Sequence, residues 1–178
     1  MAIALRIFAA LSLFIFMAAC EPVVLVDETR SQSLVVGSVD IDVSQFAGLK
    51  GREFKLPPEQ VAADIERELR AVLTRSGAPN TDLKLVVTDF RLVSPGQAFA
   101  LGGQSSITGM LSVVDRATGA VIVPPTKVVG LSEQLRLGGV IGAVTSPAAD
   151  KDYRQTLRGF AASIHQQLYG VKPGAVGA

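Results

Sequence analysis

The stretch ITGMLSVVDRATGAVIV, residues 107–123, predicts two antiparallel strands joined by a tight turn. In its first half, successive residues alternate between the two sides of an extended chain, which is the pattern of a half-buried strand. The turn falls at Asp115–Gly119, where Gly119 can adopt the positive φ that such turns often require. This stretch therefore predicts a β-hairpin inside a sheet.

The return strand of this hairpin begins at Val121 and soon meets Pro124 and Pro125. Neither proline can donate a hydrogen bond to a β-ladder. We therefore expect this strand to be kinked or to lie at a sheet edge, and to resume over residues 127–135.

Two further segments, 34–43 and 83–92, have strand-like patterns. The first places Asp40 and Asp42 on one side of the chain and apolar residues on the other. Two carboxylates could hold a cation, but no run of oxygen ligands like that of a calcium loop follows, so a solvated face is favoured. The second segment changes phase around Val86–Val87, which indicates a β-bulge or burial on both faces.

Apolar residues at helical spacing predict two amphipathic helices. The first begins at Pro57–Pro58, because proline is tolerated in the first turn of a helix, and it ends before Gly77. The last begins at Ser146–Pro147 and ends before Gly170. The apolar stripes are Val61, Ile65, Leu69, Val72 and Leu73 in the first helix and Tyr153, Leu157, Phe160, Ala161, Ile164 and Leu168 in the last.

The order strand, helix, strand, strand, strand, helix predicts a single α+β domain over residues 34–170. We expect a mostly antiparallel sheet of about four strands with two helices packed on it. Residues 45–56 and 94–106 contain glycine and polar side chains, so we expect loops there. Residues 20–33 are expected to form a tether, with part of it docked as an edge strand as an alternative, and residues 171–178 a flexible tail.

Composition excludes several kinds of protein. The chain has 17 Lys and Arg against 16 Asp and Glu, so it lacks the basic surface of a nucleic-acid binder. It has no Trp and 6% aromatic residues, which gives few platforms for stacking on bases. The single cysteine, Cys20, excludes an internal disulfide and a metal site built from several cysteines. No metal or cofactor is expected.

Residues 1–19 have the layout of a secretory signal peptide. Arg6 is their only charged residue, and the apolar run that follows ends in small residues. This run is shorter than the about 20 residues that a helix needs to cross a bilayer, so a permanent transmembrane anchor is disfavoured. The alternative is an ordinary secreted protein cleaved at Ala18–Ala19, but an unpaired Cys20 thiol would then need an explanation in an oxidising compartment.

The motif MAAC, residues 17–20, resembles the lipobox of bacterial lipoproteins, in which small residues precede an acylated cysteine; Met17 stands where leucine is usual. The resemblance implies that Cys20 carries a diacylglycerol thioether and an N-linked acyl chain such as palmitate. Two or more chains hold a protein on a membrane, because each buried methylene contributes about 0.8 kcal/mol. Glu21 follows the cysteine instead of Asp, which favours the periplasmic face of the outer membrane, with that of the inner membrane as the alternative.

An apolar, glycine-rich stretch, 135–147, includes Gly138, Gly139, Val140, Ile141 and Gly142. It is not a phosphate-binding loop, because the G-x-x-x-x-G-K-[ST] pattern requires a lysine that is absent, and the dinucleotide fingerprint fails on spacing. An apolar loop near an acylated cysteine is a candidate contact for lipid or for a partner protein. The alternative is a loop folded over the hydrophobic core.

His165 is the only histidine and lies at the border of the last helix's apolar stripe. It has no histidine partner for a metal site, so we interpret it as a boundary residue whose hydrogen bonds are satisfied. A hydrolase would need it as the base for a serine, with Ser105, Ser106 and Ser132 as candidates. No G-x-S-x-G motif marks any of these serines.

The predicted order of elements over residues 34–170 is similar to that of small uncharacterised Gram-negative envelope lipoproteins and of transport-auxiliary lipoproteins. The resemblance is one of architecture, and architecture alone does not fix function. Together with the anchor, it favours a non-enzymatic adaptor or accessory subunit of an envelope complex, with the membrane and an envelope protein as partners. The alternatives are a module that binds lipid or a small apolar ligand between helices and sheet and, least favoured, a hydrolase.

Overall fold

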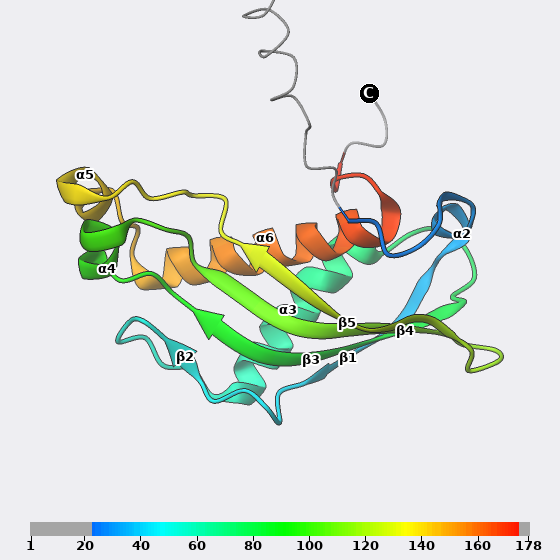
Figure 1. Cartoon of the computed structure of the whole chain (residues 1–178). Helices are drawn as coiled ribbons and strands as arrows, with labels where there is room; N and C mark the ends of the chain where they lie inside the picture. The colour runs from blue at the N-terminus through cyan, green and yellow to red at the C-terminus, as the bar shows by residue number, and fades with distance from the viewer. Residues whose placement is uncertain (1–22, 175–178) are drawn as a thin grey trace, which may run out of the picture.

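The computed structural model describes residues 23–174, which form a five-stranded sheet with five helices (Figure 1). The strands are β1 (Val36–Asp42), β2 (Leu49–Lys50), β3 (Thr81–Arg91), β4 (Ser106–Asp115) and β5 (Val121–Leu131). The helices are α2 (Glu28–Ser33), α3 (Pro58–Leu73), α4 (Pro95–Leu101), α5 (Gly139–Val144) and α6 (Ala149–Tyr169). No helix in this range is long and apolar enough to span a bilayer. The predicted signal peptide, Cys20 and the last residues of the predicted tail, 175–178, lie outside the described range.

The sheet is mixed, so the prediction of a mostly antiparallel sheet carrying two helices is wrong in both respects. Its order is β1-β3-β4-β5, with β2 also paired to β3. β4 runs antiparallel to both of its neighbours, β3 and β5, but β1 and β2 run parallel to β3. The reason is that α3 joins β1 to β3, and a crossover through a helix returns the chain in its original direction.

The predicted hairpin is confirmed. β4 and β5 pair antiparallel, and Gly119 in the turn has a φ of 71°. β5 is the last strand of the sheet, and its register with β4 is irregular where Pro124 and Pro125 interrupt it. β3 has a register shift between Val87 and Asp89, close to the predicted change of phase.

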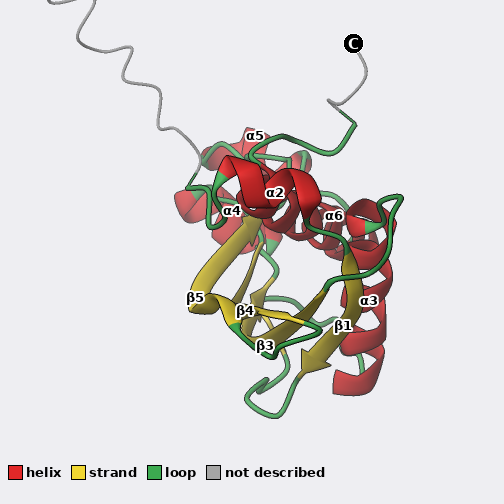
Figure 2. Ribbon diagram, turned by 90° about the vertical axis from the view of Figure 1, so that its right-hand side faces the viewer, coloured by secondary structure: helices red, strands yellow, loops and turns green. Residues whose placement is uncertain are grey.

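α3 and α6 pack on one face of the sheet, and no described helix covers the other face (Figure 1; Figure 2). α3 begins at Pro58 and α6 ends at Tyr169, just before Gly170, as predicted. The predicted apolar stripes of both helices are buried, except for the half-buried Val72. On the open face, side chains such as Lys84 remain in water.

α6 begins at Ala149, so the prediction that Ser146 caps it is wrong. The Ser146 hydroxyl donates to the Gly142 carbonyl at 2.8 Å and therefore belongs to the preceding turn. The N-cap residue of α6 makes no side-chain hydrogen bond. Asp150 and Asp152 in the first turn place negative charge near the helix N-terminus, which is favourable.

Three short helices lie where the sequence predicts a tether or loops. α2 falls in the predicted tether, which corrects the alternative of an edge strand there; Asp27 caps it by accepting a hydrogen bond from the Arg30 amide at 2.9 Å. Ser94 caps α4 by accepting from the Gln97 amide at 3.1 Å. α5 lies in the glycine-rich stretch. None exceeds seven residues, which is too short for helical periodicity to be visible in the sequence.

α6 covers the end of β5 at the outer edge of the sheet. The Ser163 hydroxyl donates to the Val129 carbonyl at 3.1 Å. Two glycines allow this close approach: a Cβ on Gly159 would lie 2.0 Å from the Leu131 carbonyl oxygen, and Gly130 lies opposite on the strand. The helix and strand are therefore in backbone contact.

Gly130→Ala is expected to lower the free energy of unfolding by about 1–3 kcal/mol, because overpacking displaces backbone. The added Cβ would lie 2.2 Å from the Phe160 Cα. Gly96→Ala is the control, since its Cβ would meet nothing within 4 Å. Urea unfolding should give unchanged or slightly raised stability for the control; equal losses in the two variants would contradict the close packing.

Candidate functional site

An apolar lobe lies at one end of the domain, where α4 and α5 contact each other (Figure 1). We define it as residues 94–104 and 135–147. Seven of its large apolar side chains are exposed to water: Phe99, Leu101, Leu135, Leu137, Val140, Ile141 and Val144. Their exposed fractions run from 52% to 82%. Apolar surface gathered in this way is typical of a contact with lipid or protein.

The lobe contains the stretch singled out in the sequence. Of the five predicted contact residues, Gly138, Val140 and Ile141 are exposed, Gly139 is half-exposed and Gly142 is buried. The stretch is therefore not folded over the core. Gly142 has a packing role, because a Cβ there would lie 1.7 Å from the Leu137 carbonyl oxygen.

A buried polar cluster joins the lobe to the sheet and to α6. We call Arg52, Ser105, Arg136 and Asp152 the root cluster. Asp152 is fully buried, forms an ion pair with Arg136 and accepts a hydrogen bond from the Ser105 hydroxyl at 2.7 Å. Arg136 also donates to the Ser105 oxygen at 3.3 Å, and its backbone forms an antiparallel bridge with Gly103. The lobe is thus attached through both side chains and backbone.

Arg52 connects the two ends of the lobe. Its Nε donates to the Val93 carbonyl at 2.9 Å, just before α4, and its Nη1 donates to the Pro147 carbonyl at 2.7 Å, after α5. Burial lowers the pKa of Arg52 below its usual value; nearby Asp152 opposes this shift, and Arg136 adds to it. The cluster holds two guanidinium groups and one carboxylate, so within residues 23–174 the charge of Asp152 is shared between Arg52 and Arg136.

The residues considered for a hydrolase are not brought together. His165 Nδ1 lies 2.9 Å from the Val171 carbonyl oxygen, which confirms a boundary residue with a hydrogen-bond partner. Burial lowers the pKa of His165. Ser105 hydrogen-bonds Asp152, and the helix axis separates that aspartate from His165 by about 20 Å.

The aspartates of β1 lie in contact with water, as predicted. Asp40 is exposed and Asp42 is half-exposed. Hydrogen bonds from Ser44 lower the pKa of Asp42 below its usual value. Across residues 23–174, no three or more His, Cys, Asp and Glu side chains gather in a way that could hold a metal ion.

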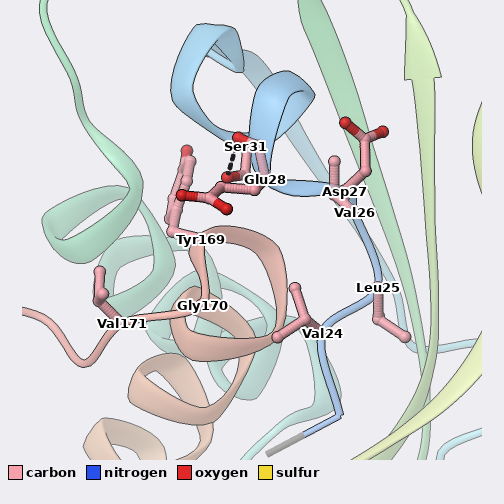
Figure 3. A pocket seen from close by; sticks show the side chains of 9 residues that line it. All are labelled: Val24, Leu25, Val26, Asp27, Glu28, Ser31, Tyr169, Gly170 and Val171. Carbon is pink, nitrogen blue, oxygen red and sulfur yellow. Dashed lines mark hydrogen bonds between the residues drawn. The ribbon is translucent and has the colours of Figure 1, made fainter.

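A cavity of about 520 Å³ opens between the first described residues, α2 and the end of α6 (Figure 3). Its lining is Val24, Leu25, Val26, Asp27, Glu28, Ser31, Tyr169, Gly170 and Val171. The Tyr169 hydroxyl is buried without a hydrogen-bond partner in the described part of the chain, and burial raises its pKa. The cavity is not the predicted pocket between helices and sheet. With two carboxylates in its lining, it suits an apolar ligand poorly.

The sequence does not single out Phe99, Leu101, Arg136 or Asp152. One signal for the first two was present: residues 94–105 contain no charged side chain, although they were expected to form an exposed loop. The burial of Arg136 and Asp152 has no comparable signal, because their partners come from distant parts of the chain.

No protein-family model matches the sequence, and no curated protein is significantly similar to it. Among solved structures, the chain is similar to a candidate lipoprotein from Caulobacter crescentus, with 17% identity and a TM-score of 0.36 over 74% of this chain and 88% of that one. It is similar to the hypothetical protein CT253 from Chlamydia trachomatis, with 11% identity and a TM-score of 0.44 over 78% and 99%. A third is the PelC dodecamer from Paraburkholderia phytofirmans, with 10% identity and a TM-score of 0.40 over 86% and 96%. Similarities this low assign no function to this chain.

Proposed function

We propose that this protein is a lipid-anchored, non-enzymatic adaptor of the cell envelope, an accessory subunit that works by docking through its apolar lobe. Acyl chains on Cys20 would hold it at the periplasmic face of the outer membrane, with the inner membrane as the alternative. The proposal is carried by the exposure of seven large apolar side chains on one lobe. Burying one such side chain in a contact contributes about 1.5–3 kcal/mol of favourable free energy, so a contact that buries several of them is strongly favoured.

The root cluster supports this proposal because it fixes the lobe before any partner arrives. Arg52 bonds the backbone at both ends of the lobe, and the Arg136–Asp152 pair is fully desolvated. A surface that is already ordered loses less conformational entropy on binding than a mobile loop does. The lobe is therefore a preformed docking surface.

The test is photo-crosslinking in cells that produce the anchored protein. A photoreactive residue at Val140 should be linked to a defined envelope component, whereas the same residue at Val121 should not. The two positions are matched, because their exposed fractions are 66% and 64%, but Val121 lies on β5, outside the lobe.

Ile141→Asp should reduce crosslinking from position 140 at least about tenfold, because burying an unpaired carboxylate costs several kcal/mol. Equal labelling from positions 140 and 121 would contradict docking through the lobe. Mass spectrometry of the mature N-terminus tests the anchor separately, and an unmodified Cys20 thiol would exclude it.

A module that binds a small ligand is the second candidate, with the cavity beside Tyr169 as its binding site (Figure 3). Asp27 and Glu28 line that cavity, and exposed lobe side chains would have no role in it. The adaptor proposal accounts for the lobe and is preferred for that reason.

A further inference from the structure

We infer that the surface covered by the apolar lobe is the lipid bilayer itself. The lobe enters the interfacial region of the membrane and gives the domain a second attachment besides the acyl chains. This inference rests on the proposed function, in which the lobe is the docking surface, and it names what the lobe contacts.

The composition of the lobe fits lipid better than protein. Residues 94–104 contain no charged side chain, and Arg136 is the only one in 135–147. Arg136 is 2% exposed and paired with Asp152, so the lobe presents no charge to its surroundings. Protein interfaces usually combine Trp, Tyr and Arg anchors with about one hydrogen bond per 100–200 Å². The seven large apolar side chains exposed on the lobe are aliphatic apart from Phe99, and a contact with lipid needs no hydrogen-bonding group from them.

Two hydroxyl groups at the tip of the lobe have hydrogen-bond partners within it. The Thr145 hydroxyl donates to the Ile141 carbonyl at 2.7 Å, and the Ser146 hydroxyl donates to the Gly142 carbonyl at 2.8 Å. These bonds satisfy the two hydroxyl protons inside the lobe, without water. Because an unpaired polar group in lipid costs several kcal/mol, hydroxyls that are already bonded favour insertion of this end of α5.

The anchor brings the bilayer within reach. Val23, the first described residue, follows Cys20 by three positions, which span about 10 Å even in an extended chain. Leu25 is fixed to the end of α6 by a hydrogen bond from its amide to the Gln167 carbonyl at 2.8 Å. The start of the described chain is therefore held at one end of α6, close to the membrane.

The lobe lies at the other end of the same helix. α6 has 21 residues and is about 30 Å long. Figure 1 and Figure 2 show α5 and α2 toward the same, upper side of the domain. One membrane plane can thus contact both the tether and the lobe. Because the acyl chains already hold the protein on the bilayer, the lobe meets lipid at a high effective concentration.

Vesicle flotation tests this inference with the mature chain, residues 20–178, purified as the Cys20→Ser variant so that no acyl chain contributes. The chain should float with uncharged phosphatidylcholine vesicles, and high salt should not release it, because the lobe carries no exposed charge. Val140→Asp should reduce the vesicle-bound to free ratio at least about tenfold. Val121→Asp, the same substitution at a matched exposure, should leave the ratio unchanged.

Three results would overturn the inference: no flotation of the Cys20→Ser chain, flotation unaffected by Val140→Asp, or equal loss with Val121→Asp. Circular dichroism of each variant confirms that it is folded. If position 140 crosslinks to a protein in cells while the chain does not float, the docking surface is real and its partner is a protein. If position 140 crosslinks to nothing in cells, the proposed function fails, whatever the vesicles show.

Discussion

Asp152→Ala is expected to lower the free energy of unfolding by about 3–5 kcal/mol, the loss typical when one partner of a buried ion pair is removed. Without this carboxylate, the guanidinium groups of Arg136 and Arg52 remain desolvated and uncompensated. The Ser105 hydroxyl also loses its acceptor. Urea unfolding followed by circular dichroism measures the change. Hydrogen exchange should show α4 and α5 losing protection first, because the root cluster is what holds the lobe.

The control for this prediction is Asp150→Ala, two residues earlier on α6. Asp150 also pairs with an arginine, Arg154, but its side chain is 53% exposed. An exposed ion pair contributes at most about 1 kcal/mol to stability, so the free energy of unfolding of this variant should stay close to that of the wild type. Similar small losses in the two variants would show that the root cluster does not stabilise the fold.

The second large effect is expected for Phe90→Ala, which should lower the free energy of unfolding by about 3–5 kcal/mol. Phe90 is fully buried and stacks on Tyr153, with ring centroids 5.2 Å apart. It pairs across the sheet with Leu49 on β2 and Ile107 on β4, so its removal leaves a cavity where strands and α6 meet.

Phe99→Ala provides the matched comparison, because Phe99 is 52% exposed on the lobe. Its truncation should change stability by about 0.5 kcal/mol or less in urea unfolding. The same variant should weaken crosslinking from position 140, because it removes part of the contact surface of the lobe and leaves the hydrophobic core intact. A loss of several kcal/mol for Phe99→Ala would mean that the lobe is part of the core.

Long elements could be predicted from the sequence because their periodicity extends over several turns or pleats. The α6 stripe from Tyr153 to Leu168 and the hairpin around Gly119 are examples, and both are confirmed. The direction of β1 relative to β3 could also have been predicted from the order of the elements. A strand, a helix and a strand in succession form a crossover, so β1 and β3 had to be parallel if they were neighbours. Strand neighbours depend on distant contacts, which a local pattern does not contain.

The lobe could be predicted only in part. Val140 and Ile141 stood out because they lie in an apolar stretch that breaks the strand and helix patterns. α4 was not predicted, since seven residues do not define a period and its cap, Ser94, also suits a loop. The burial of Arg136 and Asp152 could not be predicted, because a charged residue is normally exposed and only the folded chain brings this pair together.

The backbone contact between α6 and β5 also bears on whether copies of the chain can pair through the edge of the sheet. A bare strand edge is a template to which a strand of another copy can add. In β5, the Val129 carbonyl already accepts a hydrogen bond from the Ser163 hydroxyl. Pro124 and Pro125 have no amide hydrogen to donate to an added strand. Addition of a second copy's strand to β5 is therefore disfavoured at these positions.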